Sequence, residues 1–395
     1  MREATPLVLA SLDAAVGAAW GGSVDATAAA KPFVVADYGT ADGGTSMVLM
    51  HELCAALRRP GSAAADAPIQ IVYEDQSVNV WHDLFMRLDK IIPGPPSYLR
   101  AFDDVYAAAV GRSFYESVVP PGTVHLGISF TAMHWLSAPP AAGLDGAIHH
   151  ALGSKAGGSA AAEQHGAFAA AAATDWERML VCRARELAPG GQLVFANFAI
   201  DERGQFLGST AATDGGPRCS MYETKDELWR ELGAEGVITA AEVEACTFAN
   251  YYRSLDEFRA PFDDAGSAVR RAGLKLVSAE TRVVRCPYRA AWLRQTGQHD
   301  HPAAGELLQS FGGGDGAGAG VVERTAREHA AWFVPTTRTW SNSTYMNALD
   351  ASRRTDQERK GIVDAFFQRY EERVALAPED HGMDYVHAYC VMEKE

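Results

Sequence analysis

Short apolar runs alternate with segments of helical spacing along the first half of the chain. The run in "KPFVVADYG" (31–39) is rich in β-branched and aromatic residues, which predicts a buried parallel strand. In "TSMVLMHELCAALRR" (45–59) apolar residues recur at helical spacing and stop before Pro60, so we expect a helix. Further strands are predicted in "APIQIVYED" (67–75) and "VHLGISF" (124–130). This alternation is typical of an α/β fold with a Rossmann-like, doubly wound sheet.

The second half of the chain mixes strand-like and helical segments. "DWERMLVCRARELAPGGQLVFANFAI" (175–200) predicts an amphipathic helix, a Pro-Gly-Gly stop and a fourth strand. Strand-like sequence returns in "GLKLVSAETRVVRC" (273–286), and "DYVHAYCVM" (384–392) offers a final strand that could be an edge of the sheet. Between them, "FGGGDGAGAG" (311–320) has the composition of a flexible loop, and "RTDQERKGIVDAFFQRYEERVA" (354–375) predicts a helix.

These elements divide the chain into a core and a cap. A mainly helical block stands between late strands, and its simplest interpretation is a cap inserted over the sheet. We expect the following segments: 1–214, a ligand-binding α/β core; 215–264, a helical cap insertion; 265–300, a return to the core sheet; 301–375, a helical and loop extension of the cap; and 376–395, a C-terminal core strand.

Composition and charge narrow the class of protein. With 395 residues, 47% hydrophobic and 22% charged, the chain can bury a large core. The formal net charge is −15, which repels nucleic acid and anionic membranes, and no dense basic cluster overrides it. We therefore expect no nucleic-acid or membrane partner.

Six cysteines stand far apart without a CxxC pair, which argues against a zinc site and against a disulfide framework. The first thirty residues lack a basic segment followed by a continuous apolar run, so no signal peptide or membrane span is expected. Both observations favour a reducing, cytoplasmic location. His149 and His150 lie in Ala/Gly-rich sequence and are expected in a solvated loop, and no spacing of ligands predicts a metal site.

The stretch "FVVADYGTADGGTSM" (33–47) holds the first candidate chemistry. Its strand ends at Asp37 and turns through three glycines, which lets a ligand approach the backbone. The glycine spacing departs from the G-x-G-x-x-G dinucleotide fingerprint, which argues against the rival class of nicotinamide-dependent oxidoreductases. A second acid, Asp75, ends the next strand. Acids at two adjacent strand ends suit a ligand with a ribose diol and a cationic group, and S-adenosylmethionine has both.

Six motifs, in order over roughly residues 33 to 260, resemble the SABATH family of S-adenosylmethionine-dependent methyltransferases. They are "VADYGTADGGTS", "EDQSVNVWHDLF", "GRSFYESVVP", "SFTAMHWLSAPP", "RARELAPGGQLVF" and "EGVITAAEVEACTFANYYRSLDEF". Plant members of this family methylate small carboxylic acids such as salicylate, benzoate and jasmonate, and some purine nitrogens. The resemblance implies the methyltransferase fold and S-adenosylmethionine as the cofactor, and it adds a homodimer as an expectation.

The resemblance also implies which residues bind the cofactor. The first motif would meet its methionine part, the acid at the second strand end would take both ribose hydroxyls, and the third motif would lie beside the adenine. Thr45 stands where the family has Asn, and Gln76 stands where it has Leu. The implied cofactor-binding residues are Asp37, Gly39, Thr45, Asp75, Gln76, Ser113 and Phe114.

His134 and Trp135 match the family positions that hydrogen-bond the acceptor's carboxylate. A carboxylate is ionised at neutral pH, so methyl transfer to it needs orientation more than a strong base. Phe248, Tyr251 and Tyr252 could line the acceptor pocket or form the hydrophobic core of the cap.

The predicted function is methyl transfer from S-adenosylmethionine to a small-molecule acid, most simply to the carboxyl oxygen. Methylation of sulfur or nitrogen on a carboxylate-bearing metabolite stays open, with the carboxylate as an anchor. A non-catalytic ligand-binding protein on a methyltransferase scaffold is the alternative of another class, and the presence of both cofactor acids together with His134 and Trp135 argues against it.

Overall fold

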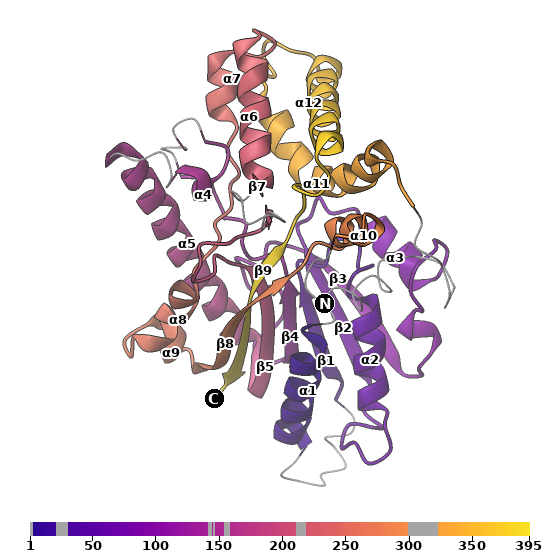
Figure 1. The fold of residues 1–395 in the computed structure, drawn as a ribbon. Helices are drawn as coiled ribbons and strands as arrows, with labels where there is room; N and C mark the ends of the chain where they lie inside the picture. The colour runs from indigo at the N-terminus through magenta and orange to yellow at the C-terminus, as the bar shows by residue number, and fades with distance from the viewer. Residues whose placement is uncertain are drawn as a thin grey trace.

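A seven-stranded sheet forms the centre of the molecule (Figure 1). The computed structural model describes residues 3–20, 31–140, 144, 147–153, 159–210, 219–298 and 323–395. The strand order is β3-β2-β1-β4-β5-β9-β8; the first five strands are parallel, and β9 runs antiparallel to both of its neighbours. The bounds are β1 Phe33–Tyr38, β2 Ile69–Asp75, β3 Val105–Gly111, β4 Val124–Phe130, β5 Leu187–Phe198, β8 Leu274–Val284 and β9 Tyr385–Lys394.

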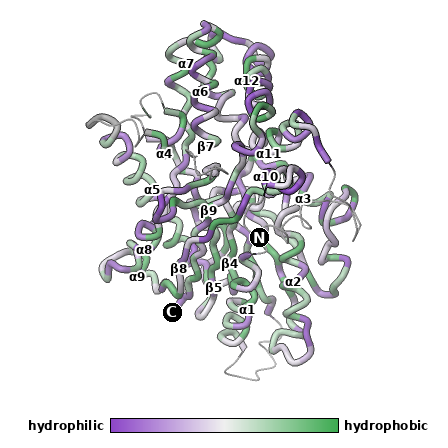
Figure 2. The backbone as a smooth tube through the Cα atoms, in the orientation of Figure 1, coloured by the Kyte–Doolittle hydropathy of each residue, from purple (hydrophilic) through white to green (hydrophobic). Residues whose placement is uncertain are grey.

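Helices cover both faces of this sheet, as the prediction of a doubly wound fold requires. Alternate residues of each strand point to opposite faces, so Phe33 and Val35 of β1 pack on one side and Val34 and Ala36 on the other. The first side is covered by α1 (Thr5–Trp20), α2 (Met47–Leu57), α3 (Trp81–Leu88) and the short helix η2 (Tyr98–Arg100), and the second by α5 (Ser159–Glu186), α8 (Leu255–Asp263) and α9 (Ala268–Arg271). In Figure 2 the central strands around β4 are mostly hydrophobic, whereas the edge strand β8 is largely hydrophilic.

A block of helices lies over the carboxyl ends of the strands (Figure 1). Its apolar core includes Phe198, the last residue of β5, so the block rests directly on this edge of the sheet. The block contains α4 (His150–Gly153), α6 (Met221–Ala234), α7 (Ala240–Ala245), α10 (Pro287–Gln295), α11 (Ala326–Ala348) and α12 (Asp356–Leu376), beside a two-stranded ribbon of β6 (Ser209–Thr210) and β7 (Cys219–Ser220). We call it the cap. Of the segment 215–264, α8 packs on the sheet and not in the cap.

Two strands differ from the predictions. β9 was expected to be able to form an edge, but it pairs with β5 on one side and β8 on the other, so the edge strand at this end of the sheet is β8. The continuous apolar run of β9 fits this interior position. β3 was not predicted, because "VYAAAVG" is dominated by alanine, a weak strand former. The predicted loop 311–320 lies outside the described residues.

The strand order reverses between β1 and β4, which flank each other at the middle of the sheet. In open α/β sheets the crevice at this switch point is where ligands bind, outside the carboxyl ends of the strands. Asp37 lies at the end of β1, and His134 lies four residues after the end of β4. Among the described helices, none is long and apolar enough to cross a membrane.

Candidate active site

The turn after β1 is held tightly against its neighbours. Gly39 has a φ of 76°, and its N–H donates to the carbonyl oxygen of Glu74 at 2.9 Å. A Cβ atom on Gly39 would lie 2.3 Å from the Cβ of Ala132. Glycine is therefore needed here both for the left-handed backbone and for the close approach of the segment after β4.

Asp37 and Asp75 lie at the ends of adjacent strands, as predicted. β1 and β2 are parallel neighbours, so their carboxyl ends meet at one edge of the sheet. The Asp75 carboxylate accepts the N–H of Ala41 at 2.7 Å with Oδ2 and the N–H of Gln76 at 2.7 Å with Oδ1. Each carboxylate oxygen has two lone pairs, so both keep acceptor capacity for a ligand.

The electrostatics of this edge favour a cationic ligand. Asp37 is buried, and its Oδ2 accepts a hydrogen bond from the Thr40 hydroxyl at 3.0 Å. Burial, and to a lesser degree the nearby charge of Asp75, raises the pKa of Asp37 to about 6. Glu74, also buried, has its pKa raised to about 8, again mainly by burial. In the described part of the chain no cationic side chain pairs with Asp37.

The remaining predicted cofactor residues surround the same edge. Ser113 and Phe114 follow β3, the neighbour of β2, and the N–H of Arg112 donates to the carbonyl oxygen of Asp75 at 2.9 Å. Phe114 is buried in the sheet core, whereas Ser113 is half-buried. Thr45 and Gln76 are both exposed and lie at the rim.

A buried ion pair fixes the segment that contains Phe114, and sequence reasoning missed it. Arg183 on α5 donates from Nη1 to the carbonyl of Phe114 at 2.9 Å, and from Nη2 to the carbonyl of Glu116 at 2.7 Å. The same Nη2 is 2.7 Å from Oε1 of Glu186, and the hydroxyl of Tyr38 donates to Oε2 of Glu186 at 2.9 Å. Both charged side chains are fully buried. Their spacing of three on a helix was visible in the sequence, but nothing local indicated that it would face the core.

His134 is buried beside the ends of β4 and β5. Its ring centroid lies 5.2 Å from that of Trp135 and 4.8 Å from that of Phe198. Burial, and next the charge of Arg253, lowers the pKa of His134 to about 3, so the imidazole is neutral at physiological pH. Its Nδ1 atom is buried and has no hydrogen-bond partner in the described structure.

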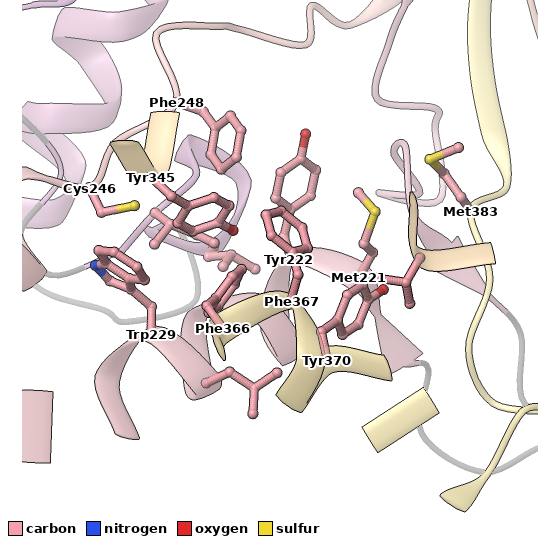
Figure 3. Close-up of a cluster of buried hydrophobic side chains, with 14 of the residues drawn as sticks. Met221, Tyr222, Trp229, Cys246, Phe248, Tyr345, Phe366, Phe367, Tyr370 and Met383 are labelled. Atoms are coloured by element: carbon pink, nitrogen blue, oxygen red, sulfur yellow. The ribbon is translucent and has the colours of Figure 1, made fainter. Parts of the chain in front are cut away.

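The predicted acceptor-side aromatics lie around this histidine to different degrees. The N–H of Tyr251 donates to the carbonyl of His134 at 2.8 Å, and the ring of Tyr252 lies 5.7 Å from that of His134. Phe248 is fully buried further into the cap, 5.5 Å from the ring of Tyr222 (Figure 3). The structure therefore brings Tyr251 and Tyr252 next to His134 and places Phe248 one layer away.

The prediction that His149 and His150 lie in a solvated loop is wrong. Both are fully buried, because the segment that carries them inserts between α6 and the Tyr251–Tyr252 segment. Nε2 of His150 accepts the N–H of Tyr252 at 2.9 Å, and its ring stacks on that of Tyr251 at 4.4 Å. The ring of His149 stacks on that of Tyr222 at 4.0 Å. The Ala/Gly-rich surroundings gave no signal of this burial.

Several buried polar atoms near His134 have no partner in the described structure. Besides Nδ1 of His134 they include Nδ1 of His150 and both ring nitrogens of His387, whose ring stacks on Phe198 at 5.2 Å. An unpaired buried polar group costs about 1–3 kcal/mol, so these atoms fit a ligand with several polar groups. A surface depression on α5, lined by Ala173, Thr174, Glu177, Arg178, Val181 and Cys182, shares no residue with this site.

Comparison with known proteins identifies the family. The sequence profile of the SAM dependent carboxyl methyltransferases matches residues 19–271. Gibberellic acid methyltransferase 1 of Arabidopsis thaliana is 26% identical over 262 residues, which cover 63% of this chain and 64% of that protein. Loganic acid O-methyltransferase of Catharanthus roseus is 26% identical over 238 residues, 58% of this chain and 57% of that protein. The chain thus matches somewhat less than two thirds of the length of these relatives.

A solved structure shares the whole fold. Loganic acid methyltransferase with SAH superimposes with a TM-score of 0.63 at 17% identity, covering 99% of this chain and 93% of that one. At this identity the likeness supports the fold alone, and it confirms the predicted methyltransferase sheet with its cap. The profile match covers both strand-end acids and the His134–Trp135 pair, and it confirms the resemblance seen in the motifs. The chain belongs to the family of S-adenosylmethionine-dependent carboxyl methyltransferases.

Proposed function

We propose that this protein transfers a methyl group from S-adenosylmethionine to the carboxylate of a small-molecule acid. The observation that carries the proposal is the family match over residues 19–271, which includes the residues at both halves of the candidate site. Relatives named for gibberellic, loganic and jasmonic acid support an acid as the acceptor class.

The residues at the ends of β1 to β3 fit the cofactor. Asp37, buried without a cationic partner in the described structure, would take the amino group of the methionine part beside Gly39. The free lone pairs of Asp75 would accept both ribose hydroxyls. Ser113 and Phe114 would lie beside the adenine, with Thr45 and Gln76 at the rim. When bound, the sulfonium supplies an activated methyl group.

On the acceptor side, His134 and Trp135 would orient the carboxylate. A neutral imidazole and an indole each have one N–H to donate, and together they can hold one carboxylate oxygen and leave the other free to attack. The carboxylate is already ionised, so His134 need not remove a proton, which fits its lowered pKa. The contribution of this pair is proximity and alignment.

The cap would exclude water from the reacting groups. A carboxylate that attacks a sulfonium loses charge on the way to products, so a site that excludes water favours the transfer. Tyr251 and Tyr252 would contact the acceptor directly, and Phe248 would shape the cap behind them. Replacing these side chains should therefore change acceptor choice more than cofactor affinity.

Product analysis tests the proposal. We expect that labelled S-adenosylmethionine, incubated with the protein and a panel of small acids, gives an alkali-labile methyl ester, and that the amide of the same acid is inert. A product that resists mild base and keeps a free carboxylate would show sulfur or nitrogen methylation instead. No transfer to any acid, amine or thioether, with cofactor binding intact, would favour a non-catalytic scaffold and contradict the proposal.

The resemblance to the family suggests a homodimer, and the scattered cysteines favour a cytoplasmic location. Sedimentation equilibrium of the purified chain tests the first, and a fluorescent fusion tests the second.

A further inference from the structure

A buried lysine lies in the cap, and among the described residues no carboxylate pairs with it. Lys225 is on α6, three residues after Tyr222, and its side chain is fully buried. Its Nζ lies 4.7 Å from the ring centroid of Trp340 and 5.5 Å from that of Tyr370. The hydroxyl of Ser341 accepts its one hydrogen bond in the described structure, at 3.4 Å.

These contacts do not compensate for the burial of an ammonium group. Moving a charged amine out of water costs several kcal/mol, and a cation–π contact returns about 0.5–2 kcal/mol. Within the described residues no Asp or Glu forms an ion pair with Lys225, and burial lowers its pKa to about 7. A methionine would fill the same aromatic surroundings without this cost. Packing therefore does not account for an amine at position 225.

Lys225 is linked to the candidate acceptor site by a continuous series of aromatic contacts. Trp340, which faces its Nζ, lies 6.2 Å from the ring of Tyr222. The hydroxyl of Tyr222 is 2.6 Å from that of Tyr252, whose ring borders His134. Figure 3 shows Tyr222 among the cap aromatics that include Phe367 and Tyr370.

We propose that Lys225 binds a second carboxylate of the acceptor, so that the substrate class is a small dicarboxylic acid. The inference rests on the proposed function. One carboxylate would be held by His134 and Trp135, the carbon skeleton would lie against the tyrosines, and the far carboxylate would accept hydrogen bonds from Nζ of Lys225. Methyl transfer breaks the sulfur–methyl bond and forms one ester bond, and the far carboxylate stays ionised.

This arrangement predicts the product. The monomethyl ester has a single carboxylate, so it can place that group at His134 and Trp135 only by presenting its neutral ester to Lys225. The second methylation should therefore be slow, and the monoester should accumulate.

Kinetics with matched acceptors test the inference. Adipate and suberate are each compared with their own monomethyl ester, using labelled S-adenosylmethionine and three proteins: wild type, Lys225→Met, and Lys360→Met as a control at an exposed lysine of α12. For the wild type and the control, KM for the diacid should be about tenfold to a hundredfold below that for the monoester, the range for hydrogen bonds to a charged group. In Lys225→Met the two values should converge, while its melting temperature should not fall.

Two results would overturn the inference. One is a wild type that does not distinguish diacid from monoester. The other is a Lys225→Met protein that loses turnover of both acceptors equally, because this would mean that Lys225 holds the reacting carboxylate or only supports the fold. Failure of the proposed function would look different. No ester would form from any acid, yet adipate with S-adenosylhomocysteine would still raise the melting temperature of the wild type and not that of Lys225→Met.

Discussion

The carboxyl ends of β1 to β3 and the interior of the cap meet at one site but are built in opposite ways. At the strand ends, Gly39, Ala41 and Gln76 donate backbone N–H groups to neighbouring carboxylate or carbonyl oxygens, so the turns are fixed before any ligand binds. On the cap side, the imidazoles of His134 and His150 each have a buried nitrogen that no described residue pairs with. The backbone of the first region is fixed in advance, and the second region has polar groups that a bound ligand would satisfy. This difference fits a cofactor that is the same throughout the family and an acceptor that differs from one member to another.

The two regions also respond to pH with opposite signs. Burial raises the pKa of the strand-end carboxyls Asp37 and Glu74, so folding loses stability there as pH rises through their folded values. Burial lowers the pKa of His134 and His150, so folding loses stability there as pH falls below the usual histidine value of 6.5. Binding of a cationic ligand should reduce the loss of stability that Asp37 and Glu74 cause at high pH, since a nearby positive charge favours their ionised form.

Removing the buried ion pair should have the largest effect, on the cofactor side. Arg183→Met leaves Glu186 buried without its partner and frees the carbonyls of Phe114 and Glu116, so we expect a loss of about 3–5 kcal/mol in the free energy of unfolding. Denaturant unfolding measures it. Arg112→Met is the matched control in the same segment, since its ion pair is exposed. Equal small losses in both variants would mean that the segment is held by other contacts.

Adding a methyl group to the turn after β1, by Gly39→Ala, should have the second-largest effect on stability. Gly39→Ala combines a positive φ with a Cβ contact of 2.3 Å, and we expect a loss of about 2–4 kcal/mol in unfolding free energy. Gly61 has a similar φ of 86° but open space within 4 Å, so Gly61→Ala isolates the cost of the backbone. If the two variants lost the same stability, the close approach of Gly39 to Ala132 would contribute nothing to the loss.

Replacing Asp75, the proposed ribose-binding acid, should affect cofactor binding more than folding. Asp75→Ala is expected to weaken S-adenosylmethionine binding by about 1.5–3 kcal/mol, the scale of lost charge-assisted hydrogen bonds. Titration calorimetry measures this, and a thermal melt confirms that the variant is folded. Unchanged affinity in a folded variant would contradict the assignment of this strand end to the cofactor.

The smallest expected effect is the pH dependence of stability that comes from Glu74 on the strand-end side. Glu74 has a folded pKa of about 8 against an ordinary 4.5, so the folded state keeps a proton that the unfolded state releases between these values. Stability from this group is present below pH 4.5 and lost as pH rises to 8. Glu74→Gln should therefore be about 1–3 kcal/mol more stable than the wild type at pH 8 and nearly equal at pH 4.5. A constant difference at both values would mean that Glu74 is not the titrating group.

The strand-end half of the site was predictable because its determinants are local. Asp37 and Asp75 end strands that the apolar runs predict, and parallel neighbours bring their ends together without further information. The glycine turn is also a local signal, since φ is positive at Gly39. The exception is β3, which residue propensities alone did not predict. Its alanine-rich segment forms a strand because it pairs with β2.

The cap half was only partly predictable, for a physical reason. His149, His150 and Lys225 are buried by elements far away in the chain, and no periodicity in their own segments indicates this. Lys225, for example, meets Trp340 and Tyr370 of two helices more than a hundred residues later. Aromatic density pointed to Tyr251 and Tyr252, which lie next to His134, but it could not separate them from Phe248, which lies deeper in the cap.

The central claim is that His134 and Trp135 orient the acceptor while the strand-end acids hold the cofactor. The most direct measurement compares kcat/KM for an acid acceptor with S-adenosylmethionine affinity in the His134→Ala, Trp135→Phe double variant, with the exposed His82→Ala as control. We expect a loss of about 1–3 kcal/mol in transition-state stabilisation for each donor removed, with cofactor affinity unchanged. Full activity in the double variant would contradict the account, because no acceptor could then depend on these two donors for its orientation.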